Sequence, residues 1–201
     1  MKKIKTGILG GTFNPIHNGH LIMAEYAYSD LGLDEVWIMP TGNPPHKDKA
    51  NIVSAEDRCN MIKLAITGNT HLKLSEFETE REGIIYTSDT LNLLNKKYID
   101  REFYLIIGMD SLVNIRTWHE PQIIFNEAKV VVAARNNNIS SYDSEIKKIE
   151  EEFNAEVIKL GMPLVDISSS YIRDRIKAGL SVKYILDNLV HHYITVRELY
   201  K

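Results

Sequence analysis

The sequence predicts an α/β fold, a parallel β-sheet with helices on both faces. Short runs of apolar, β-branched and aromatic residues alternate with segments whose apolar residues recur at helical spacing. Loops that contain glycine or proline follow several of these runs, and no internal repeat or low-complexity segment interrupts the alternation. Strands that alternate with helices are typical of a parallel sheet, because each crossover helix packs on one of the two faces.

The strand prediction rests on six short apolar runs. In chain order they are Ile4–Leu9, Val36–Met39, Leu72–Leu74, Phe103–Ile107, Lys129–Ala134 and Glu156–Leu160. Ligands of such sheets bind beyond the carboxyl ends of the strands, where loops lead into helices. The loops that carry chemistry are therefore expected after Leu9, Met39, Ile107 and Asp166.

Helices are predicted between the strands from the spacing of apolar residues. Ser54 and Asp57 form a capping pattern at the start of one helix, and Ser141–Phe153 reads as an amphipathic, exposed helix. The apolar faces of the others are Leu21, Ala24, Tyr28 and Leu31; Met61, Leu64 and Ala65; and, after Thr87 or Ser88, Leu91, Leu93 and Leu94.

The last part of the chain, residues 168–201, has a helical pattern only. Gly179 is the expected end of one helix, and Ser181 is the expected N-cap of a second helix, Val182–Leu189. We therefore expect a single compact unit. It would consist of a Rossmann-like, doubly wound parallel sheet over residues 1–167 and a short C-terminal helical tail over residues 168–201.

Composition and charge exclude several classes of protein. The 201 residues are 44% hydrophobic, and the net charge of −3 comes from interspersed acidic and basic residues. Nucleic-acid-binding proteins usually carry a basic face or tail, so no nucleic-acid partner is expected. No apolar stretch has the length of a signal peptide or a membrane span, so we expect a cytoplasmic protein without a membrane partner. The one cysteine, Cys59, is expected to be a buried apolar residue.

The loop after the first strand has the properties of a phosphate site. It contains two glycines and two histidines and leads into a helix; its candidate residues are Gly10, Gly11, Thr12, Phe13, His17 and His20. Glycines let the backbone approach a ligand, and a helix N-terminus offers unpaired amides to phosphate. The histidines are three residues apart and so share one face, where an imidazole can stabilise charge on a phosphate. A structural turn, or a metal site that lacks an evident third ligand, is the alternative.

Two segments resemble the nucleotidyltransferase superfamily. Gly11–His20 resembles its H-x-G-H signature, and Ile167–Arg173 resembles its second element, I-S-S-T-x-[IV]-R, with serine instead of threonine at position 170. The resemblance implies that His17 and His20 are catalytic and contact the ATP phosphates. It also implies that hydroxyls and a guanidinium bind the outer phosphates, from Ser168, Ser169, Ser170 and Arg173. A plain serine cap on a surface helix is the alternative for this second element.

Three further loops resemble one family of this superfamily, the nicotinate mononucleotide adenylyltransferases. They are P-x-x-x-P-P-H-K at Pro40–Lys47, Y-T-x-D-T at Tyr86–Thr90 and I-I-G-x-D at Ile106–Asp110. The resemblance implies that the acceptor is bound by Asn43, His46, Lys47, Thr87 and Trp118. Backbone amides near Thr87 would hold its carboxylate, and Trp118 offers an aromatic face to a pyridine ring. An incidental basic pair in an exposed turn, and core packing of Trp118, are the alternatives.

The same resemblance implies an ATP-binding role for residues of the phosphate loop and of two central strands. They are Gly10, Gly11, Thr12, Phe13, Gly108, Asp110 and Arg135. Arg135 ends a strand as in the family, but asparagines follow it where the family has Pro-Gly, which leaves its placement open.

The implied reaction is transfer of AMP from ATP to nicotinate mononucleotide, which gives deamido-NAD and pyrophosphate in NAD biosynthesis. Mg²⁺ is expected to bind mainly through the ATP phosphates, without a metal site built by the protein. A phosphopantetheine adenylyltransferase is an alternative, although it would not require Pro44–Lys47 or Tyr86–Thr87. A non-catalytic nucleotide-binding module is the other, and assembly into a homo-oligomer stays open.

Overall fold

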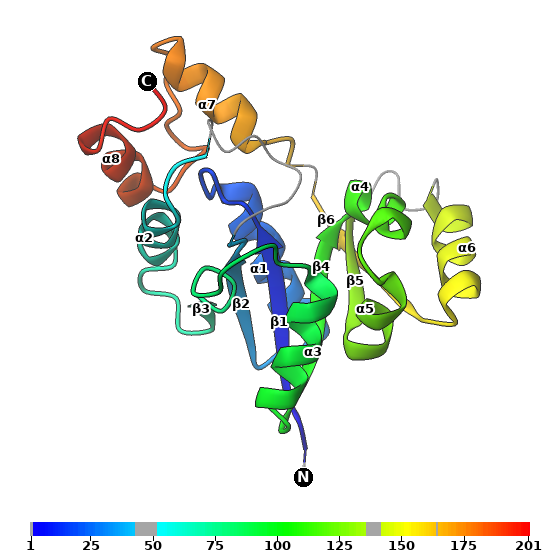
Figure 1. The fold of residues 1–201 in the computed structure, drawn as a ribbon. Helices are drawn as coiled ribbons and strands as arrows, with labels where there is room; N and C mark the ends of the chain where they lie inside the picture. Colours follow the sequence, from blue (N-terminus) through cyan, green and yellow to red (C-terminus); the bar gives the residue numbers. More distant parts are fainter. Residues whose placement is uncertain (1, 43–51, 136–141, 164) are drawn as a thin grey trace.

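Six parallel strands form one sheet in the order β3-β2-β1-β4-β5-β6 (Figure 1). The computed structural model describes residues 2–42, 52–135, 142–163 and 165–201, without the side chains of residues 134 and 135. From β1 the chain builds the sheet outward to β3, then crosses back and continues from β4 to β6. The predicted doubly wound parallel sheet is therefore confirmed, with its change of direction between β1 and β4.

Every predicted strand is present. The strands are β1 Ile4–Gly11, β2 Glu35–Pro40, β3 Leu72–Leu74, β4 Arg101–Gly108, β5 Lys129–Arg135 and β6 Val157–Met162. The predicted and observed bounds of β1 differ at its end. The strand was expected to end at Leu9, but Gly10 and Gly11 continue it and pair with Met39 and Pro40 of β2. The glycines that were expected in a loop thus end a strand, and the loop begins at Thr12.

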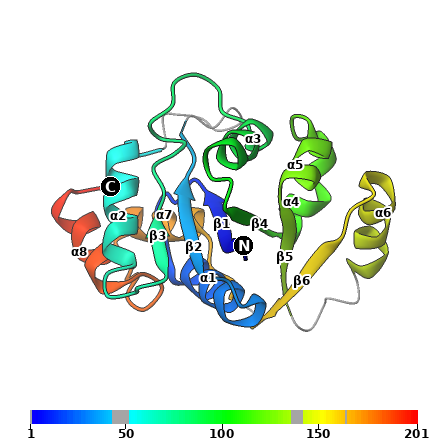
Figure 2. The ribbon, with the colours of Figure 1, turned by 90° about the horizontal axis from the view of Figure 1, so that it is seen from below.

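Helices cover both faces of the sheet (Figure 2). In chain order they are α1 Asn18–Leu31, α2 Ala55–Ala65, α3 Thr87–Lys97, α4 Met109–Val113, the 3₁₀ turn Ile115–Thr117, α5 Pro121–Glu127, α6 Asp143–Phe153, α7 Ser169–Lys177 and α8 Asn188–Val196. Apolar residues of α1, α2, α7 and α8 form the core on one face, and those of α3 to α6 form the core on the other.

Several predicted helix ends are confirmed. The Ser54 hydroxyl accepts a hydrogen bond from the Asp57 amide at 2.9 Å and caps α2. Gly179 follows α7 in the left-handed region, at φ 67°, where an L side chain would be strained. Cys59 is buried in α2, and burial raises the pKa of its thiol, as expected for an apolar role.

The predicted helix Val182–Leu189 is wrong. Residues 181–187 are not helical: a bridge between Lys183 and Leu186 encloses a turn. Helix α8 begins at Asn188 with Asp187 as its N-cap, whose carboxylate accepts from the Leu189 amide at 2.8 Å. Val182 and Leu186 are both buried, so their helical spacing reflects two contacts of a turn with the core. Ser181 does cap a neighbour, but the amide it accepts from belongs to Lys183 in that turn.

Apolar residues of α7 and α8 share one core cluster with those of α1 and α2. The Tyr193 hydroxyl on α8 and the guanidinium of Arg197, the residue after this helix, both donate to the Asp57 carboxylate on α2. The division of this single compact unit into a domain over residues 1–167 and a tail over residues 168–201 stays a prediction. Among the described segments, no helix has the length and apolar character needed to cross a membrane.

Candidate active site

Two adjoining cavities open at the carboxyl ends of β1 and β4, where the sheet changes direction. One has a volume of about 480 Å³ and the other of about 640 Å³. His20, Met23 and Gly108 line both cavities, so the two spaces meet beside the first turn of α1. Two ligands, one in each cavity, would therefore contact each other at this junction.

The two predicted histidines lie at the junction and contact each other. Their rings stack with centroids 3.7 Å apart, and the His17 amide donates to His20 Nδ1 at 3.2 Å. The ring of Phe13 packs edge-on against His20 at 4.9 Å. The backbone and the neighbouring rings thus hold the His20 imidazole in one orientation, with its far side toward the cavities.

His17 is the more deeply buried of the pair. It is the N-cap residue of α1 and is 5% exposed. Burial lowers its pKa to about 4, so the ring is neutral at neutral pH. Within the described part of the chain its Nδ1 has no hydrogen-bond partner. His17 therefore lines the larger cavity as a neutral hydrogen-bonding group.

The phosphate loop turns at Phe13 and not at its glycines. Phe13 has a φ of 49°, in the left-handed region, whereas Gly10 and Gly11 are not among the residues with positive φ. At Gly10 an added Cβ would meet no atom within 4 Å, which leaves the strand end open to a ligand. The Phe13 side chain itself is buried and lines neither cavity, so its part is to support His20.

The second predicted element, at the start of α7, is bound to the phosphate loop. The Ser169 hydroxyl donates to the Pro15 carbonyl at 2.8 Å, and Arg173 Nη1 donates to the Asn14 carbonyl at 2.9 Å. Ser168 caps α7 by accepting from the Tyr171 amide. The structure thus brings together two segments more than 150 residues apart, and both line the larger cavity. The alternative of an isolated serine cap is not sufficient, although the cap exists.

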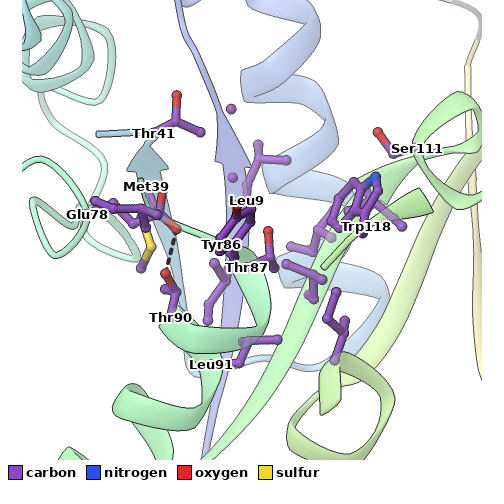
Figure 3. Close-up of a pocket in the computed structure, with 18 of the residues that line it drawn as sticks. Leu9, Met39, Thr41, Glu78, Tyr86, Thr87, Thr90, Leu91, Ser111 and Trp118 are labelled. Carbon is purple, nitrogen blue, oxygen red and sulfur yellow. Dashed lines mark hydrogen bonds between the residues drawn. The ribbon is translucent and has the colours of Figure 1, made fainter. Parts of the chain in front are cut away.

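The smaller cavity has an aromatic end and a polar end (Figure 3). Trp118 and Ser111 lie on one side, Thr41 and Glu78 lie on the other, and Thr87 lies between them. Thr87 is the first residue of α3, so the unpaired amides of that helix begin there. Trp118 thus brings an aromatic face to the cavity that the start of α3 also lines.

Sequence reasoning missed the polar end. Glu78 is buried, accepts a hydrogen bond from the Thr90 hydroxyl at 2.8 Å, and has its pKa raised by burial. Thr41 has a buried hydroxyl oxygen for which the described residues provide no partner. In the sequence, Glu78 belongs to the charged stretch Glu76–Glu82, which is typical of a solvent-exposed turn, so nothing local marked it.

The predicted site residues divide between the two cavities. The smaller cavity has Gly10, Gly11, Thr12, Thr87 and Trp118 in its wall, and the larger has His17, Asp110, Ser168, Ser169, Ser170 and Arg173. Gly10, Gly11 and Thr12 were expected to bind ATP, but they line the smaller cavity together with Trp118. Asn43, His46 and Lys47 lie outside the described residues, as does the side chain of Arg135, although β5 ends at this residue as expected.

Known proteins share both the sequence and the fold. A family model described as cytidylyltransferase-like matches residues 8–175. Probable nicotinate-nucleotide adenylyltransferases of Lachnoclostridium phytofermentans and Clostridium kluyveri are each 40% identical to this chain. Both alignments cover 98% of this chain, and they cover 98% and 100% of the relatives.

The solved structures include Plasmodium falciparum nicotinic acid mononucleotide adenylyltransferase complexed with NaAD. It matches with a TM-score of 0.80 at 21% identity, over 98% of this chain and 97% of that one. This likeness supports the fold, and the full-length sequence relatives identify the family. The chain therefore belongs to the nicotinate-nucleotide adenylyltransferases, within the cytidylyltransferase-like superfamily.

Proposed function

We propose that this chain transfers AMP from ATP to nicotinate mononucleotide, releasing pyrophosphate and forming deamido-NAD for NAD biosynthesis. This is the activity named for its full-length relatives, and the Plasmodium falciparum enzyme of the same fold was solved with NaAD and with APC. The single observation that carries the proposal is that two cavities of different character share the wall at His20.

The acceptor is proposed to occupy the smaller cavity. Its pyridine ring would stack on Trp118, and its carboxylate would take the amides at the start of α3 near Thr87. Gly10, Gly11 and Thr12 would then border the part of the acceptor that approaches the junction. Asn43, His46 and Lys47 are proposed to bind its phosphate.

ATP is proposed to occupy the larger cavity. Ser168, Ser169, Ser170 and Arg173 would bind the outer phosphates. The remaining proposed contacts are Gly108, Asp110 and Arg135, and Phe13, which lines neither cavity, would act through the ring of His20. In this arrangement Ser169 and Arg173 would also hold the phosphate loop, because each donates to one of its carbonyl groups.

The chemistry requires positioning and charge stabilisation, with no base and no covalent intermediate. The acceptor's phosphate oxygen is already an anion, and it must lie in line with the α-phosphorus of ATP. His20 would donate to an α-phosphate oxygen as negative charge grows there. His17, which is neutral, would contribute a hydrogen bond without a full charge.

Mg²⁺ is proposed to accompany ATP, bound mainly through its phosphates. Among the described residues that line the larger cavity, Asp110 is the one carboxylate. A single carboxylate fits an ion that keeps its water molecules and takes further oxygen ligands from a nucleotide. When bound, the ion would offset charge on the pyrophosphate leaving group.

The test is a pyrophosphate-release assay with ATP and Mg²⁺ and three acceptors in parallel: nicotinate mononucleotide, nicotinamide mononucleotide and phosphopantetheine. We expect the highest kcat/KM with nicotinate mononucleotide. A preference for either other acceptor would overturn the proposal, and release of no pyrophosphate with any acceptor would favour a non-catalytic module.

A further inference from the structure

Arg58 lies on α2, directly behind the wall of the smaller cavity. It is 2% exposed. Its Nη1 donates to the Thr12 carbonyl at 3.0 Å and its Nη2 to the Gly42 carbonyl at 3.5 Å. Thr12 and Gly42 both line the smaller cavity, and neither lines the larger one. One guanidinium thus joins the loop after β1 to the loop after β2.

The charge of Arg58 is not neutralised by the residues that the structure describes. Its two hydrogen-bond acceptors are carbonyl groups, and its buried Nε has no partner. The adjacent Asp57 carboxylate accepts hydrogen bonds from other groups, namely Ser54, Tyr193 and Arg197. Burial lowers the pKa of Arg58, but an arginine in a protein remains a cation.

A buried cation that no described carboxylate neutralises is costly, so its presence calls for a reason. Carbonyl groups alone could be held by a neutral donor. What a neutral donor cannot supply is a positive potential at the cavity wall, which attracts an anion on the other side. Because Arg58 contacts residues of the acceptor cavity only, the anion that it would attract is the acceptor.

We propose that Arg58 is a positioning residue whose buried charge, acting across Thr12 and Gly42, selects an acceptor that carries a phosphate. It does not touch the substrate in this arrangement; it holds the two loops and supplies a counter-charge behind them. The inference rests on the proposed function, since it assumes that the acceptor occupies the smaller cavity.

Charge and scaffolding can be separated by removing the phosphate from the ligand instead of from the protein. Nicotinate riboside has the ring, carboxylate and ribose of the acceptor but lacks its phosphate. If Arg58 only holds the two loops, its replacement should weaken the binding of both ligands alike, because both need well-formed loops. If Arg58 acts as a counter-charge, its replacement should weaken the binding of nicotinate mononucleotide alone.

The experiment measures the Kd of both ligands by calorimetry on the full chain without ATP. For Arg58→Met we expect the Kd of nicotinate mononucleotide to rise about tenfold or more, and that of the riboside to stay within about twofold. Arg58→Lys should keep most of the affinity for the mononucleotide. Arg58→Gln, which retains an amide donor for one carbonyl, provides the same comparison if Arg58→Met does not fold.

The matched control is Arg197→Met, which removes one positive charge next to α2 from a half-exposed side chain. Neither Kd should change by more than about twofold. An equal rise in both Kd values for Arg58→Met or Arg58→Gln, or no rise in either, would overturn the inference. The wild-type pyrophosphate assay tests the proposed function independently, because it does not involve Arg58.

Discussion

His17 and His20 belong to one short motif, but the structure gives them different surroundings. His20 is held by the His17 amide and two rings and borders both cavities. His17 is buried, neutral and confined to the larger cavity. The spacing of the two residues predicted that they would share a face. It did not predict that burial would lower the pKa of one of them.

Replacing His20 by alanine should remove a transition-state donor and leave the fold intact. By analogy with the loss of one oxyanion donor, we expect kcat to fall about 10²–10³-fold, with little change in the midpoint of thermal unfolding. Steady-state kinetics and calorimetry measure the two quantities. His192→Ala, an exposed histidine on α8, is the control and should behave as wild type. Near-normal turnover of His20→Ala would contradict the assignment.

His17 should make the free energy of unfolding depend on pH. Its pKa is about 4 in the folded chain and about 6.5 when unfolded. Between these values the unfolded chain binds the extra proton, so stability is complete above pH 6.5 and falls as the pH falls toward 4. From pH 7 to pH 5 the loss that His17 causes should be about 2 kcal/mol.

The variant His17→Asn tests this pH dependence, because asparagine can cap α1 but does not titrate. Urea unfolding at pH 7 and pH 5 should show a loss about 2 kcal/mol smaller than that of wild type. His192→Asn should leave the wild-type difference unchanged. Identical pH dependence in wild type and His17→Asn would show that the His17 pKa is not lowered.

At the scale of single elements, local signals predicted strands well and helix starts unevenly. Both Ser54 and Ser181 precede an apolar pattern, but only Ser54 caps a helix. The difference lies in the next residues: Asp187 offers a competing cap, and Tyr184 adopts a φ of 71°, which no helix accommodates. Local sequence could not decide between the caps, because an apolar pair four residues apart, such as Val182 and Leu186, fits the buried face of a helix as well as the observed turn.

The position of the α8 cap leads to a prediction about two similar substitutions. Asp187→Ala removes the acceptor of the Leu189 amide and should cost about 1 kcal/mol of unfolding free energy. Ser181→Ala removes a bond within an exposed turn and should cost less than about 0.5 kcal/mol. Urea unfolding of the two variants measures both. A larger loss of unfolding free energy for Ser181→Ala than for Asp187→Ala would contradict Asp187 as the N-cap and support a helix that begins after Ser181.

At the scale of the whole molecule, the C-terminal segment closes one side of the fold. Val190 and Ile194 of α8 are buried in the core beside α2, and the Tyr200 hydroxyl donates to Asn14 Oδ1 in the phosphate loop at 2.9 Å. The predicted division at residue 167 therefore separates segments that share a core. Folding and site geometry should depend on both.

Shortening the chain to end at residue 187 should destabilise the whole protein. Burial of Val190 and Ile194 alone is worth about 3–6 kcal/mol, a large part of the usual stability of about 5–15 kcal/mol. Chemical unfolding followed by fluorescence and circular dichroism should show a lower midpoint in one transition. Val196→Ser, on α8 but 64% exposed, is the control. An unchanged midpoint would show that residues 1–187 are stable without α8.

The sequence alone determined which segments become strands, the parallel sheet and the edge at which the site lies. Those features follow from local periodicity, from turn residues and from the rule that parallel strands end together. Only the tertiary structure decided that burial lowers the pKa of His17, that Phe13 adopts the left-handed turn and that α7 binds the phosphate loop. It also decided that Arg58, which forms an ion pair with none of the described residues, lies behind that loop. Each of these depends on burial or on contacts between residues far apart in the chain, and no local pattern records which side chains will lose water together.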